Sequence, residues 1–364
     1  MRKGIFTAGG FMQTDSHGTC NPLTIAGLPT SGKSTIAALL DGHSSVITGH
    51  NLFFHDCVSC FLPELHSRYD DPSTVVAESM GYSKRSYFLR MMLIKHSSFY
   101  FTIENLLNSR EFKFFLSSEE SVSLPVPSVG DFYALDRRIM EAFEAIDIQS
   151  PAQLFRVFWT NFFKSIEGID CSKVIYCSSM APNGFSDFET LLHSYPNGKI
   201  LFMNRSLEEA IGASFLREAV LTKKSFAEVL LRMQSSETAH WINNIYISQQ
   251  KALLLAKKYP EKFMVVDFEN LFIDFKKNMN AILQWISLPI LPIFEKYSFF
   301  GHSFGDTTYF SIQDNIEDRL SANDFSQLSQ FIASCIKGDY QENKRQGFTY
   351  LRRVAGSIKR KIMR

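Results

Sequence analysis

The sequence contains no run of 18 or more apolar residues in its 364 positions, so no segment has the composition of a membrane-spanning helix. Its net charge at pH 7 is only +1, which argues against nucleic acid as the main partner of the chain as a whole. It also has neither an internal repeat nor a low-complexity segment. Charged residues make up 21% and hydrophobic residues 45%, which is the balance of a folded globular protein and excludes a disordered chain.

Cysteine is also scarce, with six residues in the whole chain, and this number fits thiols that stay reduced in a reducing compartment. Cys57 and Cys60 are separated by two residues and have His55 nearby, but no second pair of ligands completes a zinc site. We therefore predict no metal site. The N-terminal residues do not form a signal peptide, and a cytoplasmic location is expected.

A glycine-rich stretch, Gly27–Thr35, follows the short apolar run Leu23–Ala26 and precedes a helical pattern. It has the form G-x-x-x-x-G-K-[ST], which is typical of a phosphate-binding loop. Glycines let the backbone turn so that successive N–H groups point at an anion, and the following helix adds the positive end of its dipole. Lys33 supplies a mobile cation, and Ser34 and Thr35 supply hydroxyls. A phosphate-bearing ligand is favoured over an ordinary glycine turn.

Short apolar segments alternate with helical patterns on both sides of the chain's middle. The predicted strands are 22–27, 45–48, 173–178, 199–204 and 263–268. Strands that alternate with helices predict an α/β fold, here a three-layer sandwich with a mostly parallel central sheet like that of P-loop NTPases.

The middle of the chain has a different pattern. Residues 73–169 are mostly helical in their periodicity, with a break at 117–131 and amphipathic helices expected at 135–146 and 152–166. This stretch is too long for an ordinary crossover connection. It therefore predicts a helical insertion over one end of the sheet.

These patterns predict one α/β domain over residues 1–310, which includes the insertion at about 61–170, and a C-terminal helical segment over 311–364. Within that segment, residues 347–364 combine apolar residues at helical spacing with lysines and arginines. Such a basic amphipathic helix can lie on an anionic membrane surface, so peripheral membrane contact is one expectation. Packing on the domain with a solvated basic side is the other.

Arg205 comes directly after the apolar strand at 199–204, and Ser214 lies nine residues further on, in the following helix. Open α/β sheets bind ligands beyond the carboxyl ends of their strands. An arginine at such an end needs an anionic partner, which is either a carboxylate in a structural ion pair or a ligand. Together with the loop, Arg205 suggests a ligand with phosphates at two separated places.

On these residues the chain resembles the sulfotransferases that use 3′-phosphoadenosine 5′-phosphosulfate (PAPS). The resemblance spans roughly 22–60 and 173–310, and it leaves the helical middle unmatched. Four stretches carry the resemblance. Leu23–Val46 looks like the family's 5′-phosphosulfate loop and helix, and Leu192–Ser214 looks like its 3′-phosphate motif. Tyr259–Leu271 looks like its strand ending in Glu-x-Leu, and Gly301–Tyr309 looks like a late loop that closes over the nucleotide.

This resemblance implies transfer of a sulfuryl group to a hydroxyl or amine of a carbohydrate or small-molecule acceptor, without a metal. It implies that Arg205 and Ser214 bind the 3′-phosphate, that Lys33 is the catalytic cation, and that His50 is the base. His55 is the reserve candidate for the base, and an ordinary loop histidine is the alternative for His50. The implied contacts to the 5′-phosphosulfate come from Thr30, Ser31, Gly32, Lys33, Ser34 and Thr35.

The loop departs from the family pattern Pro-[Lys/Arg]-[Ser/Thr]-Gly-[Ser/Thr]-[Ser/Thr] in one respect. Its basic residue, Lys33, stands three places later, as in the loops of ATP-dependent kinases. Two alternatives therefore stay open. One is an ATP-dependent small-molecule kinase with Asp267 or Asp56 as the Mg²⁺ partner. The other is an inactive nucleotide-binding module.

Overall fold

The protein is described here from a computed structural model. The structure describes residues 23–43, 45–49, 111–115, 121–125, 132–146, 157, 161, 175–179, 188–194, 197–291, 297–299, 302–304 and 319–338. Its centre is a five-stranded sheet in the order β2-β5-β1-β6-β7, with every neighbouring pair parallel. The strands are β1 (Leu23–Gly27), β2 (Val46–Gly49), β5 (Ile175–Ser179), β6 (Lys199–Asn204) and β7 (Phe263–Asp267).

The middle strands β1 and β6 are apolar along nearly their whole length because both of their faces are covered. Their register pairs Leu23 with Lys199 and Gly27 with Met203, so they end at the same edge of the sheet. The chain leaves β1 toward β2 on one side and leaves β6 toward β7 on the other. Strands β1 and β6 therefore flank the topological switch point, where successive connections run to opposite sides of the sheet. Open α/β sheets bind ligands at this point.

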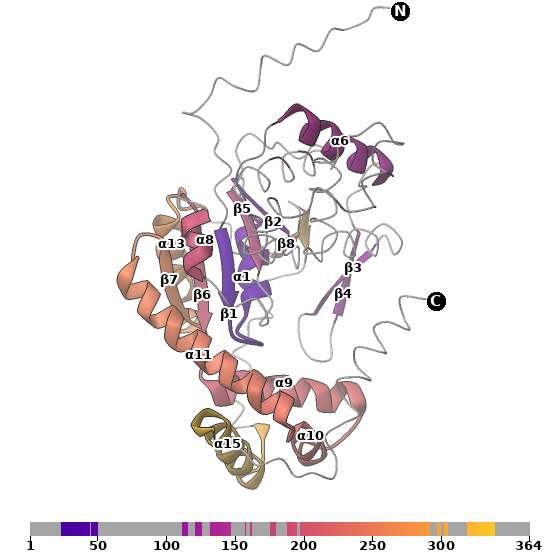
Figure 1. Ribbon diagram of the computed structural model, residues 1–364, viewed down its shortest axis with the longest axis vertical. Coiled ribbons are helices and arrows are strands. Elements are labelled where there is room, and N and C mark those ends of the chain that lie inside the picture. The colour runs from indigo at the N-terminus through magenta and orange to yellow at the C-terminus, as the bar shows by residue number, and fades with distance from the viewer. Residues whose placement is uncertain are drawn as a thin grey trace, which may run out of the picture.

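Helices cover the sheet and extend beyond it (Figure 1). They are α1 (Lys33–Leu40), α6 (Phe132–Ala145), α8 (Phe188–Ser194), α9 (Leu207–Thr222), α10 (Phe226–Met233), α11 (Ser236–Lys258), α12 (Phe268–Ile273), α13 (Phe275–Trp285) and α15 (Ala322–Lys337). Helix α1 packs on β1, β2 and β5. Helix α8 packs on β6 and β7, where Phe188 meets the rings of Phe202 and Phe263 edge to face.

Helices α9, α10, α11 and α15 gather at one end of the molecule, and α6 lies at the opposite end (Figure 1). Ser206, Ser225, Ser235 and Ser321 cap the N-termini of these four helices, each with its side chain accepting a backbone N–H. Serine is among the preferred residues at this position because its hydroxyl satisfies one of the unpaired donors of the first turn. None of the helices in the described ranges is long and apolar enough to span a membrane.

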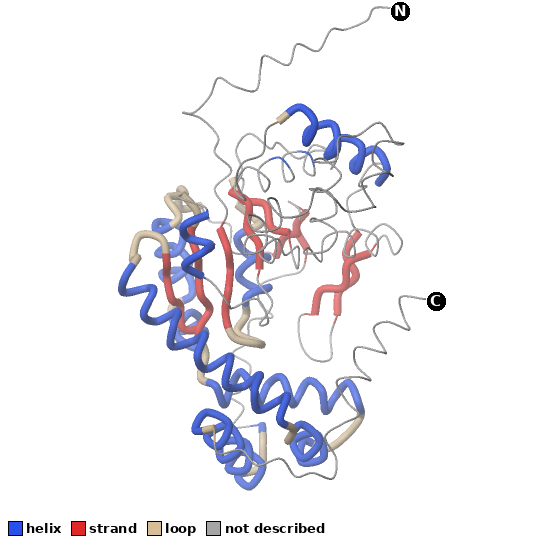
Figure 2. Tube along the Cα trace, viewed as in Figure 1, coloured by secondary structure: helices blue, strands red, loops and turns tan. Residues whose placement is uncertain are grey.

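The predicted α/β class and parallel sheet are confirmed, and all five predicted strands appear within two residues of their expected bounds. The helical prediction is wrong at 111–115 in the middle region, whereas 121–125 lies within the break predicted at 117–131. There, β3 (Glu111–Phe115) and β4 (Ser121–Pro125) form an antiparallel hairpin, which Figure 2 shows apart from the central sheet. Phe112 and Phe114 alternate with charged residues in β3, a period of two that a count of aromatic residues does not reveal.

Other predictions for the middle region have mixed outcomes. Helix α6 confirms the amphipathic helix expected at 135–146. Of the helix expected at 152–166, only Val157 and Asn161 are described, and both are helical. Most of the insertion and the basic tail at 347–364 lie outside the described residues, and the domain division at 310 stays a prediction. Within the C-terminal segment, the structure describes helix α15.

The end of α1 is linked to a distant segment through His43, which lies within the first stretch of resemblance. The backbone N–H of Ser45 donates to His43 Nδ1 at 3.0 Å. The proton of the neutral ring therefore resides on Nε2, which donates to the carbonyl of Pro289 at 3.1 Å. The side chain is buried, so this histidine has a structural role between α1 and the segment after α13.

Candidate active site

The loop after β1 makes a tight turn at the carboxyl edge of the sheet. Gly27 has a φ of 152° and Gly32 a φ of 74°, both in the region that favours glycine. A Cβ on Gly27 would lie 2.4 Å from the carbonyl oxygen of Met203 in β6, and a Cβ on Gly32 would lie 2.4 Å from a ring carbon of Phe268. The sequence requires glycine at both positions because the loop passes so close to its neighbours.

The hydroxyls of the loop stabilise its own turn. Ser31 Oγ donates to the carbonyl of Leu28 at 2.7 Å, and its side chain is buried. Thr30 has a left-handed φ of 54°, and its hydroxyl lies 2.9 Å from the carbonyl oxygen of Ala210 in α9. Ser214 Oγ donates to the same Ala210 oxygen at 2.9 Å. Ser214 and the loop residue Thr30 therefore share one acceptor in α9, and binding of a phosphate by Ser214 stays a prediction.

Lys33 is folded back over the loop. Its Nζ donates to the carbonyl of Gly27 at 3.0 Å and to that of Leu28 at 2.5 Å. Burial lowers the pKa of the Lys33 ammonium to about 7, because a charged group loses its hydration there without gaining a carboxylate. An anion bound in the loop would supply the missing opposite charge. The Lys33 side chain is thus placed to bind an anion at the loop.

The N-terminus of α1 faces the same place with its charge uncompensated. No side chain caps it, its N-cap residue being Gly32, and no acidic residue stands in its first turn. The first N–H groups of a helix and the positive end of its dipole favour an anion at such a position. Ser34 and Thr35 lie in this first turn, directly after Lys33.

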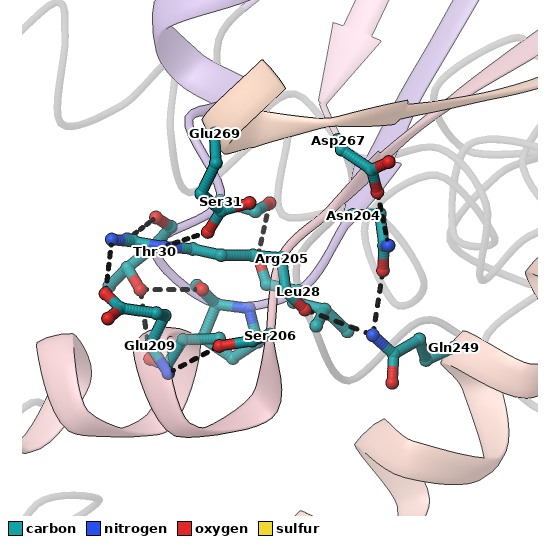
Figure 3. A network of polar contacts seen from close by, with 12 residues as sticks. Leu28, Thr30, Ser31, Asn204, Arg205, Ser206, Glu209, Gln249, Asp267 and Glu269 are labelled. Carbon is teal, nitrogen blue, oxygen red and sulfur yellow. Dashed lines mark hydrogen bonds and ion pairs between the residues drawn. The ribbon is translucent and has the colours of Figure 1, made fainter. Parts of the chain in front are cut away.

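Arg205 reaches the loop from the end of β6. Its Nη1 donates to the carbonyl of Thr30 at 2.9 Å, and its side chain is 7% exposed (Figure 3). The guanidinium lies over the ring of Phe268, with Cζ 4.8 Å from the ring centroid. The arginine and the loop therefore belong to one site, although 175 positions separate them in sequence.

Two carboxylates neutralise Arg205. Nη2 donates at 3.0 Å to Glu209 Oε2, which lies in the first turn of α9. Nε lies 3.4 Å from Glu269 Oε1, at ion-pair distance, but the geometry makes no hydrogen bond, and Nε is a buried donor without one. This nitrogen can therefore donate to a bound ligand. The side chain of Glu269 is 41% exposed, so it can give way to one.

A second row of polar contacts aligns the strand ends beside Arg205. Asn204 donates to Asp267 Oδ1 at 2.6 Å across the β6–β7 pair. Gln249 of α11 donates to Asn204 Oδ1 at 2.8 Å and to the backbone oxygen of Arg205 at 3.0 Å (Figure 3). These bonds hold the backbone from which the Arg205 side chain projects.

The predicted base is not among these residues. His50 and the reserve candidate His55 lie outside the described residues, as do Asp56 and the pair Cys57 and Cys60. Across the ranges that the structure describes, no group of three His, Cys, Asp or Glu side chains is placed to hold a metal ion.

Several residues of the site were missed by sequence reasoning. Glu209 could have been found, because it stands in the first turn of the helix that follows Arg205, four residues further along the chain. Glu269 and Phe268 belong to a stretch that carries the resemblance, yet only their position after the adjacent strand β7 brings them to Arg205. Gln249 has no signal in the sequence, since it reaches the site from the middle of a long helix.

Comparisons with known proteins give the following matches. The family model described as "Sulfotransferase family" matches residues 22–292. No curated protein matches the chain. Among solved structures, the sulfotransferase domain of the Synechococcus PCC 7002 olefin synthase has 15% identity and a TM-score of 0.42, over 88% of this chain and 97% of that one. A sulfotransferase from Alicyclobacillus acidocaldarius has 14% identity and a TM-score of 0.37, over 87% of this chain and 96% of that one.

Proposed function

The chain belongs to the sulfotransferase family and is a sulfotransferase, and we propose that its donor is PAPS and its acceptor a hydroxyl or amine of a carbohydrate or small molecule. Membership follows from the family model, which covers most of the chain. The donor is argued from the residues of the site. In this proposal the loop at Gly27–Thr35 is a P-loop that holds the 5′-phosphosulfate.

The observation that carries the proposal is the pair of anion sites that meet at the switch point. One is the uncapped N-terminus of α1 with Lys33, and the other is Arg205, whose buried Nε donor has no hydrogen bond. Because Arg205 touches the loop through Thr30, one ligand with two phosphate groups can reach both sites. Adenosine 3′,5′-bisphosphate, the nucleotide part of PAPS, has this arrangement. A nucleotide with a single phosphate chain lacks the separate phosphate that this proposal assigns to Arg205.

In the reaction, an acceptor oxygen or nitrogen forms a bond to sulfur, the bond between sulfur and the bridging phosphate oxygen breaks, and the electron pair stays on that oxygen. Negative charge grows on the phosphate oxygens, which in this proposal lie at the N-terminus of α1 beside the Lys33 ammonium. Donors that are already oriented stabilise such charge at little reorganisation cost. Lys33 has only to exchange the carbonyls of Gly27 and Leu28 for the ligand oxygens.

The acceptor loses a proton in the same step, and a base near it takes this proton up. His50 is proposed for this role from its position after β2, and this stays a sequence-based assignment. Ser214 is proposed to donate to the 3′-phosphate by rotating away from Ala210. Contact of the basic tail with a membrane surface and a cytoplasmic location likewise stay predictions from the sequence.

The kinase alternative is less well supported. Its proposed Mg²⁺ partner, Asp267, already accepts from Asn204 at 2.6 Å and from Asn270 at 3.4 Å. These contacts give the carboxylate a role in aligning β6, β7 and α12. The position of Lys33 in the loop, as in ATP-dependent kinases, is the observation that favours this alternative.

Calorimetric titration with adenosine 3′,5′-bisphosphate, and separately with ATP and Mg²⁺, tests the donor. We expect metal-independent binding of the bisphosphate and transfer of labelled sulfate from PAPS to an acceptor panel. The variant Arg205→Gln should lose most of its preference for the bisphosphate over adenosine 5′-phosphate. Arg232→Gln is the matched control, because Arg232 is also a partly buried arginine paired with a glutamate, Glu218 at 2.9 Å. Binding of ATP with Mg²⁺ and not of the bisphosphate would refute the proposed donor.

A further inference from the structure

Phe268 lies where the loop, β6 and β7 come together. It is the first residue of α12 and follows Asp267, the last residue of β7, with no connecting residue. Asp267 pairs with Asn204 in the parallel register and accepts its side-chain hydrogen bond. At the other side, Leu271 anchors α12 with a side chain only 1% exposed. The sheet and the short helix therefore fix where the aromatic ring of Phe268 lies.

The ring lies directly against the loop. A Cβ built on Gly32 would lie 2.4 Å from Phe268 Cε2 and 2.7 Å from Cδ2. The ring thus fills the space that any side chain at position 32 would need. Gly32 is the N-cap of α1, so the contact lies at the uncapped helix end that faces the anion site. Displacement of the ring would allow this end of the loop to move.

The same ring lies beneath the guanidinium of Arg205, whose Cζ is 4.8 Å from the centroid. A planar guanidinium is attracted to the face of an aromatic ring, and the attraction grows when water is excluded. Arg205 is 7% exposed, so water is largely excluded here. With one face on the ring and Nη1 on the Thr30 carbonyl, the guanidinium has little freedom to turn. Its Nε edge is thereby left facing the exposed carboxylate of Glu269.

From these contacts we infer that Phe268 is a positioning residue: its ring holds Arg205 against the phosphate loop and sets the separation of the two anion sites. The inference rests on the proposed function, because the separation matters for a ligand with phosphates at both places. It explains why an aromatic residue follows β7 at the point where the loop has no side chain of its own. It also makes recognition of the 3′-phosphate depend on a residue that need not touch the ligand.

The experiment compares Phe268→Leu, which keeps an apolar side chain but removes the aromatic face, with Phe268→Tyr, which keeps that face. Each variant is titrated with adenosine 3′,5′-bisphosphate and with adenosine 5′-phosphate, which lacks the phosphate assigned to Arg205. Phe268→Leu should reduce the preference for the bisphosphate about fivefold, the size of one partly desolvated cation–π contact. Phe268→Tyr should keep the preference of the unmodified protein. Phe325→Leu, a partly buried phenylalanine in α15, is the control for lost packing and should leave the preference unchanged.

A double-mutant cycle with Arg205→Gln, measured by urea unfolding without ligand, gives an independent readout. The changes in unfolding free energy at positions 205 and 268 should not be additive. Once one substitution has removed the contact between the guanidinium and the ring, the other cannot remove it again. Additive effects in the cycle, or an unchanged ligand preference in Phe268→Leu, would overturn the positioning role while leaving the donor intact. If the unmodified protein fails to bind the bisphosphate at all, both the donor and the positioning role are refuted.

Discussion

Replacing Glu269 with glutamine should make the enzyme bind adenosine 3′,5′-bisphosphate more tightly. The Glu269 carboxylate lies 3.4 Å from Arg205 Nε without forming a hydrogen bond, where the proposed 3′-phosphate needs that donor. The ligand must therefore displace this carboxylate. Glutamine has nearly the same shape and no charge, so the Glu269→Gln variant removes the competitor and leaves Arg205 with Glu209 and Phe268.

The size of the gain follows from the exposure of the pair. The Glu269 side chain is 41% exposed and the pair has no hydrogen bond, so its attraction is screened by water. Pairs of this kind contribute up to about 1 kcal/mol. Loss of that contribution in the free enzyme corresponds to about fivefold tighter binding. The gain should shrink as salt is added, since salt screens exposed charges first.

Titration calorimetry at low and high salt measures both effects, with Glu218→Gln as the matched control. Glu218 of α9 pairs with Arg232 of α10 at 2.9 Å, and the pair is partly buried. The control should leave the dissociation constant within about twofold of the unmodified value. Equal or weaker binding by Glu269→Gln, in a variant whose unfolding free energy falls by no more than about 1 kcal/mol, would show that the carboxylate does not stand in the phosphate's place.

Three further predictions concern the loop. Lys33→Met should lower kcat at least about 100-fold. The control is Lys199→Met, which should change kcat less than about twofold, because Lys199 is a partly buried lysine that donates to the Trp285 carbonyl at the other edge of the sheet. Similar losses of kcat in both variants would contradict a catalytic Lys33. Because burial lowers the pKa of Lys33 to about 7 and a bound anion raises it again, binding takes up a proton above pH 7. Affinity for the bisphosphate should therefore fall as pH rises from about 7 to 9, by up to about tenfold per unit, and Lys33→Met should abolish this slope. Finally, Gly32→Ala should reduce stability and ligand binding more than Gly338→Ala. The two glycines have nearly the same φ, 74° and 73°, but only a Cβ at position 32 would meet an aromatic ring. Equal unfolding free energies of the two variants would contradict the contact between position 32 and Phe268.

The parallel α/β sheet could be predicted because its signals are local. Strand β6 is an apolar run bounded by Lys199 and Asn204, and burial on both faces requires such a run. The hairpin of β3 and β4 could not be predicted from clustered phenylalanines. Helices and strands both bury aromatic residues, and pairing with a second strand decided the outcome. Helix α12 could not be predicted either, because its six residues are too few for a helical period to appear.

The sequence by itself predicted the proposed anion site at Gly27–Thr35, because the glycines, the lysine and the start of α1 all lie within nine consecutive residues. It also identified Arg205 as an unusual charge at a strand end, without deciding between an ion pair and a ligand contact. Only the tertiary structure decided what surrounds that charge: the carbonyl of Thr30, the carboxylate of Glu269 and the ring of Phe268. The physical reason is that parallel strands distant in sequence end at one edge of the sheet, and the contacts made there depend on strand order and register, which no local pattern encodes.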